Sequence, residues 1–209
     1  MTVEELIKLS MQEMQVIDAR TDPDSVEYAL GVKRLNTLIA SLQNDMVFLT
    51  YQDTQSITTV ANTATYSAAA NTHHIRYFSD RDVNVLSRKD ADQYEDSDYV
   101  SGRINVFVEY NTTPPTIEFM IAPTDSGDVY EYRRDVLLTD LTQSDDISLS
   151  NEALEMLILG LAYKLCPAFG VEVARRESIK ADYLMELNKY RQAQTFRVGT
   201  EIVAPNMVV

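Results

Sequence analysis

Three residue types are scarce in this 209-residue sequence, which has one cysteine, two histidines and no tryptophan. The single cysteine, Cys166, cannot form an intrachain disulfide. His73 and His74 are adjacent in a predicted strand, where neighbouring side chains point to opposite faces, so they cannot jointly bind one metal ion. No cysteine pair stands near them to complete a zinc site. We therefore expect no metal or other cofactor.

Glycine is also scarce, and neither G-x-x-x-x-G-K-[ST] nor G-x-G-x-x-G occurs among the six glycines. The sequence therefore contains neither of these nucleotide-binding motifs. The longest apolar run covers residues 156–162, far short of the roughly 20 residues that span a bilayer. The first residues show no secretion-signal pattern. We expect a soluble protein that is made in the cytoplasm and has no membrane partner.

Positive charge is the third deficit. The sequence has 18 Lys and Arg against 32 Asp and Glu, which gives a net charge of -14. Non-specific DNA binding depends on basic side chains that neutralise phosphates, so it has no general support here. Hydrophobic residues make up 45% of the chain. That is enough for the core of one domain, or of one domain with a sizeable insertion.

The N-terminal part of the chain has two helical patterns. Thr2 and Glu5 form a capping box for the first helix. Asp22 followed by Pro23 predicts the start of a second, longer helix, which runs to about residue 49. The apolar residues of this second helix recur at spacings of three and four and make one stripe. This stripe needs a partner helix.

The C-terminal part predicts a helical hairpin around Cys166. Ser150 can cap a helix over residues 151–166 that is apolar nearly all round, which is typical of a buried helix. Pro167 disfavours helix at Cys166, and Gly170 permits a left-handed turn into a final helix. A thiol at a helix C-terminus has a raised pKa, because the helix dipole favours cations there. We therefore interpret Cys166 as a structural residue and not as a nucleophile.

Between the helices, residues 55–136 show strand patterns. Short runs rich in Thr, Val, Ile and Tyr are separated by small or polar residues. The runs 103–110 and 115–123 flank the turn sequence "NTTPP" and predict a hairpin. The acidic piece 88–99 is more like a helical turn or loop. A last strand at 128–136 alternates so that both faces suit solvent or a neighbouring subunit.

These patterns together predict an α+β protein. We expect an α-helical bundle built from both ends of the chain, with a β-rich insertion and an extended C-terminal tail. The expected boundaries are residues 1–50 for the N-terminal helices, 51–148 for the insertion, 149–194 for the C-terminal helical hairpin and 195–209 for the extended arm.

Carboxylates are the remaining candidates for catalysis. The acidic piece contains Asp90, Asp92, Glu95, Asp96 and Asp98, and a pair of carboxylates can serve as the acid and base of a glycosidase. Charge runs of this sort are usually solvated faces, and sequence alone gives no distance between two carboxyls. The run also lacks the glycine and terminal glutamate of a calcium loop. We expect no enzyme activity, with a cell-wall hydrolase as the alternative.

Basic residues gather near the C-terminus, where the final helix and the start of the tail hold six of the 18. Such asymmetry suits subunits that dock side by side, or an acidic face turned toward a repelled polyanion. We name Arg175, Arg176, Asp92 and Asp96 as candidate partner-binding residues. An ordinary solvated helix with ion pairs between successive turns is the alternative.

Four stretches in this order resemble a known family: "ALGVKRLNTLIASLQND", "ITTVANTATYSAAANTHHIRYF", "INVFVEYNTTPPTIEFMIAP" and "NEALEMLILGLAYKLCPAFGVEVARRESIKADYLMEL". The order is similar to that of the head-to-tail adaptor proteins of short-tailed bacteriophages, also called head-completion, tail tubular or packaged-DNA stabilisation proteins. The resemblance covers about residues 1–195. It departs from the family near the end of the second helix, where "MVFLTYQDTQ" replaces an aromatic pattern that often includes tryptophan.

The resemblance implies a helical bundle with a β-rich insertion, assembled as a ring that is commonly dodecameric. Such a ring joins the portal to the next tail protein, a nozzle or tail tube, with the insertion facing the tail. It extends the DNA channel and helps to retain and eject the genome. An acidic lumen would let double-stranded DNA pass without specific binding. The implied location is the virion neck, and the alternative is a component of another virion without portal contact.

The tail after Gln194 loses helical periodicity and has no obvious partner in its own chain. We expect residues 195–209 to reach the portal or an adjacent subunit, by adding a strand or by filling a groove. The candidate contact residues are the apolar side chains Phe196, Val198, Ile202 and Val203.

Overall fold

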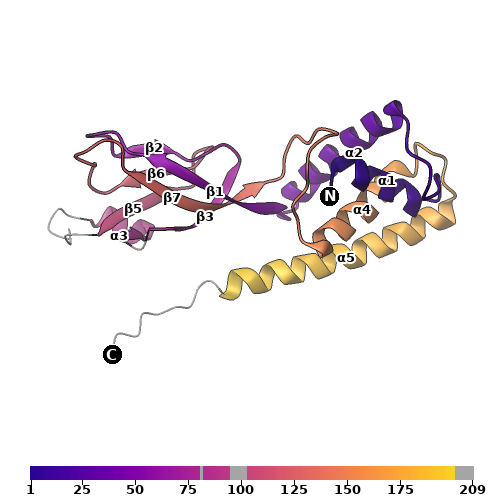
Figure 1. The fold of residues 1–209 in the computed structure, drawn as a ribbon. Coiled ribbons are helices and arrows are strands. Elements are labelled where there is room, and N and C mark those ends of the chain that lie inside the picture. Colours follow the sequence, from indigo (N-terminus) through magenta and orange to yellow (C-terminus); the bar gives the residue numbers. More distant parts are fainter. Residues whose placement is uncertain (81, 95–102, 201–209) are drawn as a thin grey trace. The chain divides into compact units, whose positions relative to one another are not determined.

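A computed structural model describes residues 1–80, 82–94 and 103–200, with side chains as far as residue 193. Over these residues the chain is α+β, as predicted, with five helices and two sheets (Figure 1). The helices are α1 (Val3–Glu13), α2 (Ser25–Asn44), α3 (Arg88–Asp92), α4 (Asn151–Leu165) and α5 (Val173–Thr200). The strands are β1 (Thr50–Thr58), β2 (Thr65–Ser67), β3 (Thr72–Phe78), β4 (Val83–Val85), β5 (Ile104–Glu109), β6 (Thr116–Phe119) and β7 (Val129–Leu137).

The chain folds as two compact units. The helical unit consists of Met1–Leu49 and Thr139–Val209, and the β unit consists of Thr50–Leu138. Both ends of the chain therefore contribute to one unit, and the other unit is inserted between them.

Helix α4 is the centre of the helical unit. It contacts α1, α2 and α5, and residues on every side of it are buried, including Met156, Leu157, Leu161 and Ala162. The prediction of a buried helix is confirmed. Gly160 lies where α4 meets two neighbours, because a Cβ built there would be 3.0 Å from Leu38 Cδ2 of α2 and 2.8 Å from Tyr183 Cε2 of α5.

The two N-terminal helices begin and end on local signals. The capping box of Thr2 and Glu5 is confirmed at the start of α1. Helix α2 begins after Asp24 and not at Asp22, because Asp24 accepts hydrogen bonds from two backbone amides of the first turn, and Glu27 accepts one from the Asp24 amide.

Helix α2 also ends at Asn44, earlier than the predicted residue 49. Met46 has a positive φ of 59°, and its amide donates to the Gln43 carbonyl at 3.0 Å. The next amide, of Val47, donates to the Leu42 carbonyl at 2.8 Å. These two hydrogen bonds, together with the left-handed residue Met46, form a Schellman motif, which ends the helix.

The segment that follows β7 packs within the helical unit, so the β unit ends at Leu138 and not at the expected residue 148. Asn36 of α2 holds this segment by its side-chain amide. Its Nδ2 donates to the Leu141 carbonyl and its Oδ1 accepts from the Leu141 amide, both at 2.9 Å. The N-terminus also pairs with it, since the Ile147 amide donates to the Met1 carbonyl at 2.8 Å.

The β unit contains two sheets around one core. Their strand orders are β1-β7-β3 and β2-β6-β5-β4. The predicted hairpin is confirmed, because β5 and β6 pair antiparallel. The last strand, β7, is the central strand of its sheet and buries Tyr132, Arg134 and Val136. The prediction that both of its faces suit solvent or a neighbour was therefore wrong.

Tyrosine hydroxyls satisfy backbone groups of the β unit that lie outside the strand ladders. The Tyr66 hydroxyl accepts from the Val60 amide at 2.9 Å, and the Tyr132 hydroxyl accepts from the Ala69 amide at 3.0 Å. The Tyr110 hydroxyl accepts from the Ile75 amide at 3.0 Å and donates to the Ile75 carbonyl at 3.4 Å. Unsatisfied backbone groups away from solvent are costly, so the bonds to Ala69 and Ile75 stabilise a turn and the outer edge of β3.

Helix α5 is longer than the sequence patterns predict. It continues to Thr200, so residues 195–200 are helical where we expected an extended arm. Between Val173 and Gly199 the sequence has no glycine or proline to end the helix. Residues 201–209, which include Ile202 and Val203, lie outside the described residues.

Substitution of Gly160 by alanine tests the packing of α4. Alanine is normally the better helix former by about 1 kcal/mol, but overpacking a filled core costs about 1–3 kcal/mol. We expect Gly160→Ala to lower the free energy of unfolding, measured by urea denaturation and circular dichroism. Ser178→Ala, on an exposed position of α5, is the control and should change stability by less than about 0.5 kcal/mol. A Gly160→Ala protein more stable than the wild type would contradict the close approach.

Candidate functional site

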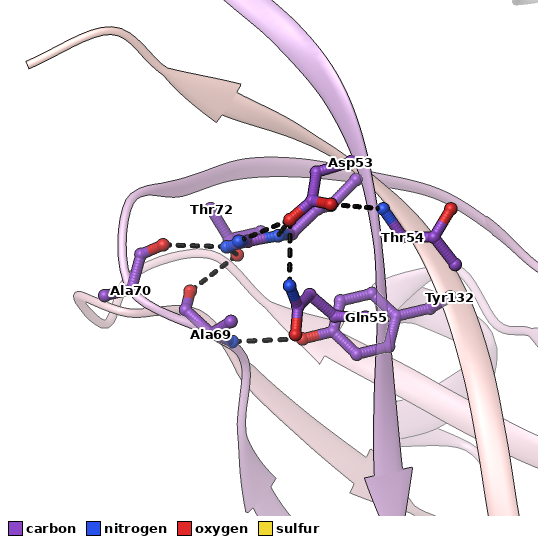
Figure 2. A network of polar contacts seen from close by, with 8 residues as sticks. Asp53, Thr54, Gln55, Ala69, Ala70, Thr72 and Tyr132 are labelled. Carbon is purple, nitrogen blue, oxygen red and sulfur yellow. Dashed lines mark hydrogen bonds and ion pairs between the residues drawn. The ribbon is translucent and has the colours of Figure 1, made fainter. Parts of the chain in front are cut away.

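A buried arginine, Arg134, is the centre of a polar network in the β unit, whose other members Figure 2 labels. The Arg134 guanidinium donates from Nη2 to Asp53 Oδ2 at 2.9 Å and from Nε to the same atom at 3.3 Å. Its Nη1 donates to the Ala70 carbonyl at 2.7 Å and to Thr72 Oγ1 at 2.8 Å. These contacts join β1, β7, and the turn that leads into β3.

The acceptors of Arg134 are themselves held in place. Asp53 accepts from the Thr54 amide at 2.8 Å and from Gln55 Nε2 at 2.9 Å. The Thr72 hydroxyl donates to the Ala69 carbonyl at 2.6 Å. Figure 2 shows the Asp53 carboxylate, the Thr72 hydroxyl and the Ala70 carbonyl converging on one place. Each acceptor of Arg134 is therefore part of a hydrogen-bond network within the protein.

Burial makes this ion pair different from a surface salt bridge. The side chain of Arg134 is 8% exposed and that of Asp53 is 33% exposed. A buried charge is tolerated only when it is paired and hydrogen-bonded. Hydrogen bonds from Gln55 and Arg134 hold the pKa of the Asp53 carboxyl below its usual range. The arrangement holds β1, β7 and the start of β3 together.

Sequence reasoning missed Arg134, although a signal for it was present. Along β7 the residues Tyr130, Tyr132, Arg134 and Val136 share one face, because side chains two apart in a strand point the same way. An arginine in the same row as core aromatic residues predicts a buried cation. Its partner, Asp53, is 81 residues away in the sequence, and no local pattern indicates that pairing.

The two histidines lie in β3 and differ in exposure. His74 is exposed and stacks on Tyr110, with ring centroids 5.4 Å apart and planes 3° apart. His73 is half-buried, and burial lowers the pKa of its imidazole. In the parts of the chain that the structure describes, no group of three His, Cys, Asp or Glu side chains could hold a metal ion.

Cys166 is fully buried at the C-terminal end of α4. Burial raises the pKa of its thiol, although Arg176 and Arg175 act in the opposite direction. A buried thiol with a raised pKa is a poor nucleophile. This geometry agrees with the structural role that we infer for Cys166.

Arg175 and Arg176, two of the candidate partner-binding residues, contact groups of their own helical unit. Arg175 Nη2 donates to the Glu13 carbonyl, and the Arg176 guanidinium lies 5.4 Å from the centre of the Tyr163 ring. The Nε atoms of both arginines are buried without a hydrogen-bond partner in the described part of the chain. Both side chains thus already make contacts within the chain.

The other candidate residues are spread over several places. Asp92 is exposed at the end of α3, with its Oδ2 3.9 Å from Arg88 Nε. Helix α3 accounts for the start of the acidic piece, for which a helical turn or loop was predicted. Phe196 and Val198 lie in the last turns of α5, where only the backbone is described. Asp96 lies outside the described residues. Asp92 belongs to the β unit, whereas Phe196 and Val198 belong to the helical unit together with Arg175 and Arg176.

A hollow of about 450 Å³ lies on the β unit. Its lining includes the apolar residues Ile104, Phe119 and Ile121 and the charged residues Arg103, Asp125 and Asp128. These residues come from the start of β5, the end of β6 and the segment between β6 and β7. The acidic run that we considered for carboxylate chemistry contributes Asp90 to an adjoining hollow, which shares Tyr94 and Asn105 with the first.

Comparison with known proteins adds no family assignment. No protein-family model matches the sequence, and no curated protein matches it with significant similarity. Among the described residues, no helix has both the length and the apolar character that crossing a bilayer requires.

Replacement of Arg134 tests whether the network holds the β unit together. Arg134→Met leaves Asp53 without its cation, and breaking a buried pair costs about 3 kcal/mol or more. We expect the free energy of unfolding, measured in urea, to fall by about 3 kcal/mol. The loss should lie at the low end of the range because Asp53 is partly exposed and keeps some contact with water. Arg133→Met is the matched control, since Arg133 is exposed and its Nη1 donates to the Tyr77 hydroxyl at 3.3 Å. Equal losses in the two variants would contradict the structural role of Arg134.

The lowered pKa of Asp53 predicts a specific pH dependence. A carboxyl whose pKa is lower in the folded state stabilises the fold above its unfolded pKa, which is about 3.9 for Asp. That contribution is lost as the pH falls through the folded pKa. The stability difference between the wild type and Asp53→Asn should therefore shrink below about pH 4. Asp182→Asn, on the exposed side of α5, is the control. A difference that stays constant down to pH 2 would refute the assignment.

Proposed function

We propose that this chain is a ring-forming adaptor between the portal and the tail of a short-tailed bacteriophage. The observation that carries the proposal is the organisation of the chain. Both ends form one helical unit around α4, and the β unit is inserted between them. This is the segment order that the resemblance to head-to-tail adaptors implies. The proposed role is mechanical, and no residue is assigned a catalytic part.

The helical unit is suited to be the ring-building part. The all-round burial of α4 and the two-bond contact of Asn36 with the returning segment give it a single, well-packed core. We propose that it forms a helical bundle in each subunit, joins its neighbours in a ring of twelve, and meets the portal. The β unit then faces the next tail protein, a nozzle or tail tube.

The charge distribution supports a channel that does not bind DNA. The helical unit has 11 basic against 18 acidic side chains and the β unit has 7 against 14, so each has a net charge of -7. Whichever unit lines the lumen, its acidic excess repels the phosphate backbone. We propose that DNA passes through the ring during packaging and ejection without specific contacts, and that the protein is located in the virion neck.

Binding to the portal is the direct test of this proposal. Native mass spectrometry is performed on the purified chain, on the portal ring of the same phage and on their mixture. We expect the mixture to contain a portal ring that carries one complete ring of this chain. A chain that ignores the portal in every mixture would refute the proposal. Removal of residues 196–209 should weaken the complex, if the tail reaches the portal or an adjacent subunit as we propose.

Two readouts separate the alternatives. Clearing of a cell-wall suspension that a single Asp or Glu substitution abolishes would favour the hydrolase alternative, and Asp125→Asn and Asp128→Asn in the hollow of the β unit are the first substitutions to make. Presence of the chain in purified virions, without binding to isolated portal rings, would favour a structural role elsewhere in the particle.

A further inference from the structure

Strand β1 has a long edge that pairs with no described strand. It lies at the border of the three-stranded sheet, and its register with β7 is continuous from Thr50 to Thr58. In an antiparallel ladder, alternate residues of a border strand direct their N–H and C=O groups away from the partner. The Thr59 amide bonds to the Asp128 carbonyl of the same register, so even-numbered residues face the free edge.

The other strand borders of the β unit are short or already protected. Strands β2 and β4 have three residues each. Strand β3 has two register irregularities, and the Tyr110 hydroxyl occupies the amide and carbonyl of Ile75. Natural sheets protect their edges by such means, and also by lysine or proline. The nine residues of β1 contain no Lys, Arg, Pro or Gly.

The sequence of β1 complements itself when a second copy is placed antiparallel to it. With Thr54 opposite Thr54, the even residues align at hydrogen-bonding positions, which gives the pairs Gln52 with Ser56 and Thr50 with Thr58. The odd residues on the other face pair as Tyr51 with Ile57 and Asp53 with Gln55. Hydroxyl pairs and aromatic with β-branched pairs are favourable across strands. No charge lies opposite a like charge.

The neighbouring registers are worse for a physical reason. A shift of two residues in one direction places Asp53 opposite Asp53, and like charges directly opposite are destabilising. A shift in the other direction places Asp53 opposite Ile57, so that a carboxylate faces an apolar side chain across the two strands. In the symmetric register Asp53 meets Gln55, and the same two side chains already bond at 2.9 Å within one chain.

We propose that two copies of this chain pair through β1, antiparallel, about a two-fold axis at Thr54. The occupant of the edge is a second β1, because the register above satisfies its outward amides and carbonyls and opposes no like charges. At the axis, the Thr54 amide exchanges its 2.8 Å bond to Asp53 Oδ1 for the Thr54 carbonyl of the other copy. The pairing does not rest on the proposed function: it concerns the free chain in solution, because neighbours in a cyclic ring meet through unlike surfaces and not about a two-fold axis.

Disulfide trapping tests the register in the full chain. The only native cysteine, Cys166, is buried, so it should not form disulfides in competition with a thiol introduced at the surface. In the paired state the two Thr54 Cα atoms are about 5.5 Å apart, within the range of a disulfide. The two Thr58 positions are about 27 Å apart, eight residues along the strands. Under mild oxidation we expect Thr54→Cys to form a covalent dimer and Thr58→Cys to stay monomeric. Equal trapping of both, or of neither, would overturn the proposal.

A charge substitution tests the same contact without a covalent bond. Thr54→Lys places two like charges opposite each other across the axis, whereas Thr58→Lys faces Thr50. Both threonines are exposed, so both variants should fold as the wild type does. We expect Thr54→Lys to raise the dimer dissociation constant at least about tenfold over that of Thr58→Lys, measured by sedimentation velocity. Equal dissociation constants would overturn the proposal, whatever the result with the portal.

Discussion

The burial of α4 is the constraint on which the organisation of the chain depends. A helix that is apolar nearly all round must be covered on several sides, and α1, α2 and α5 are the helices that contact it. Two of these come from the start of the chain and one from its end. The ends must therefore fold together, and the residues between them form a separate unit. Gly160 permits close contact with Leu38 and Tyr183 at the same point of α4.

The β unit meets a different requirement, which is to satisfy polar groups inside a small two-sheet core. Its core cluster holds residues of both sheets, including Ile75, Val106 and Tyr132. In the same unit, the buried Arg134 makes four donor contacts with protein acceptors. Tyrosine hydroxyls bond to turn and edge backbone in the same unit. Closed polar networks of this kind hold strands in a single arrangement, whereas an unpaired member would be costly.

Both units suit a protein whose work is mechanical. The thiol of Cys166 is buried, His74 is stacked on Tyr110, and Asp53 is neutralised by Arg134. These three side chains are thus engaged in contacts within the protein. The outer surface is acidic on both units, which fits a proposed role beside DNA that must move. The free edge of β1 differs from this acidic surface, because it exposes uncharged backbone N–H and C=O groups.

Local chemistry explains which parts of the fold were predictable. The capping box at Thr2, the buried character of α4 and the hairpin of β5 and β6 follow from residues a few positions apart, and sequence by itself determined them. Tertiary structure alone decided that Arg134 pairs with Asp53, that α2 ends at Asn44, and that Arg103, Asp125 and Asp128 share a hollow. The physical reason is that a charged residue can be buried only where an oppositely charged or hydrogen-bonding partner compensates it, so the partner determines its position. For Arg134 that partner is 81 residues away, where no periodicity can indicate it.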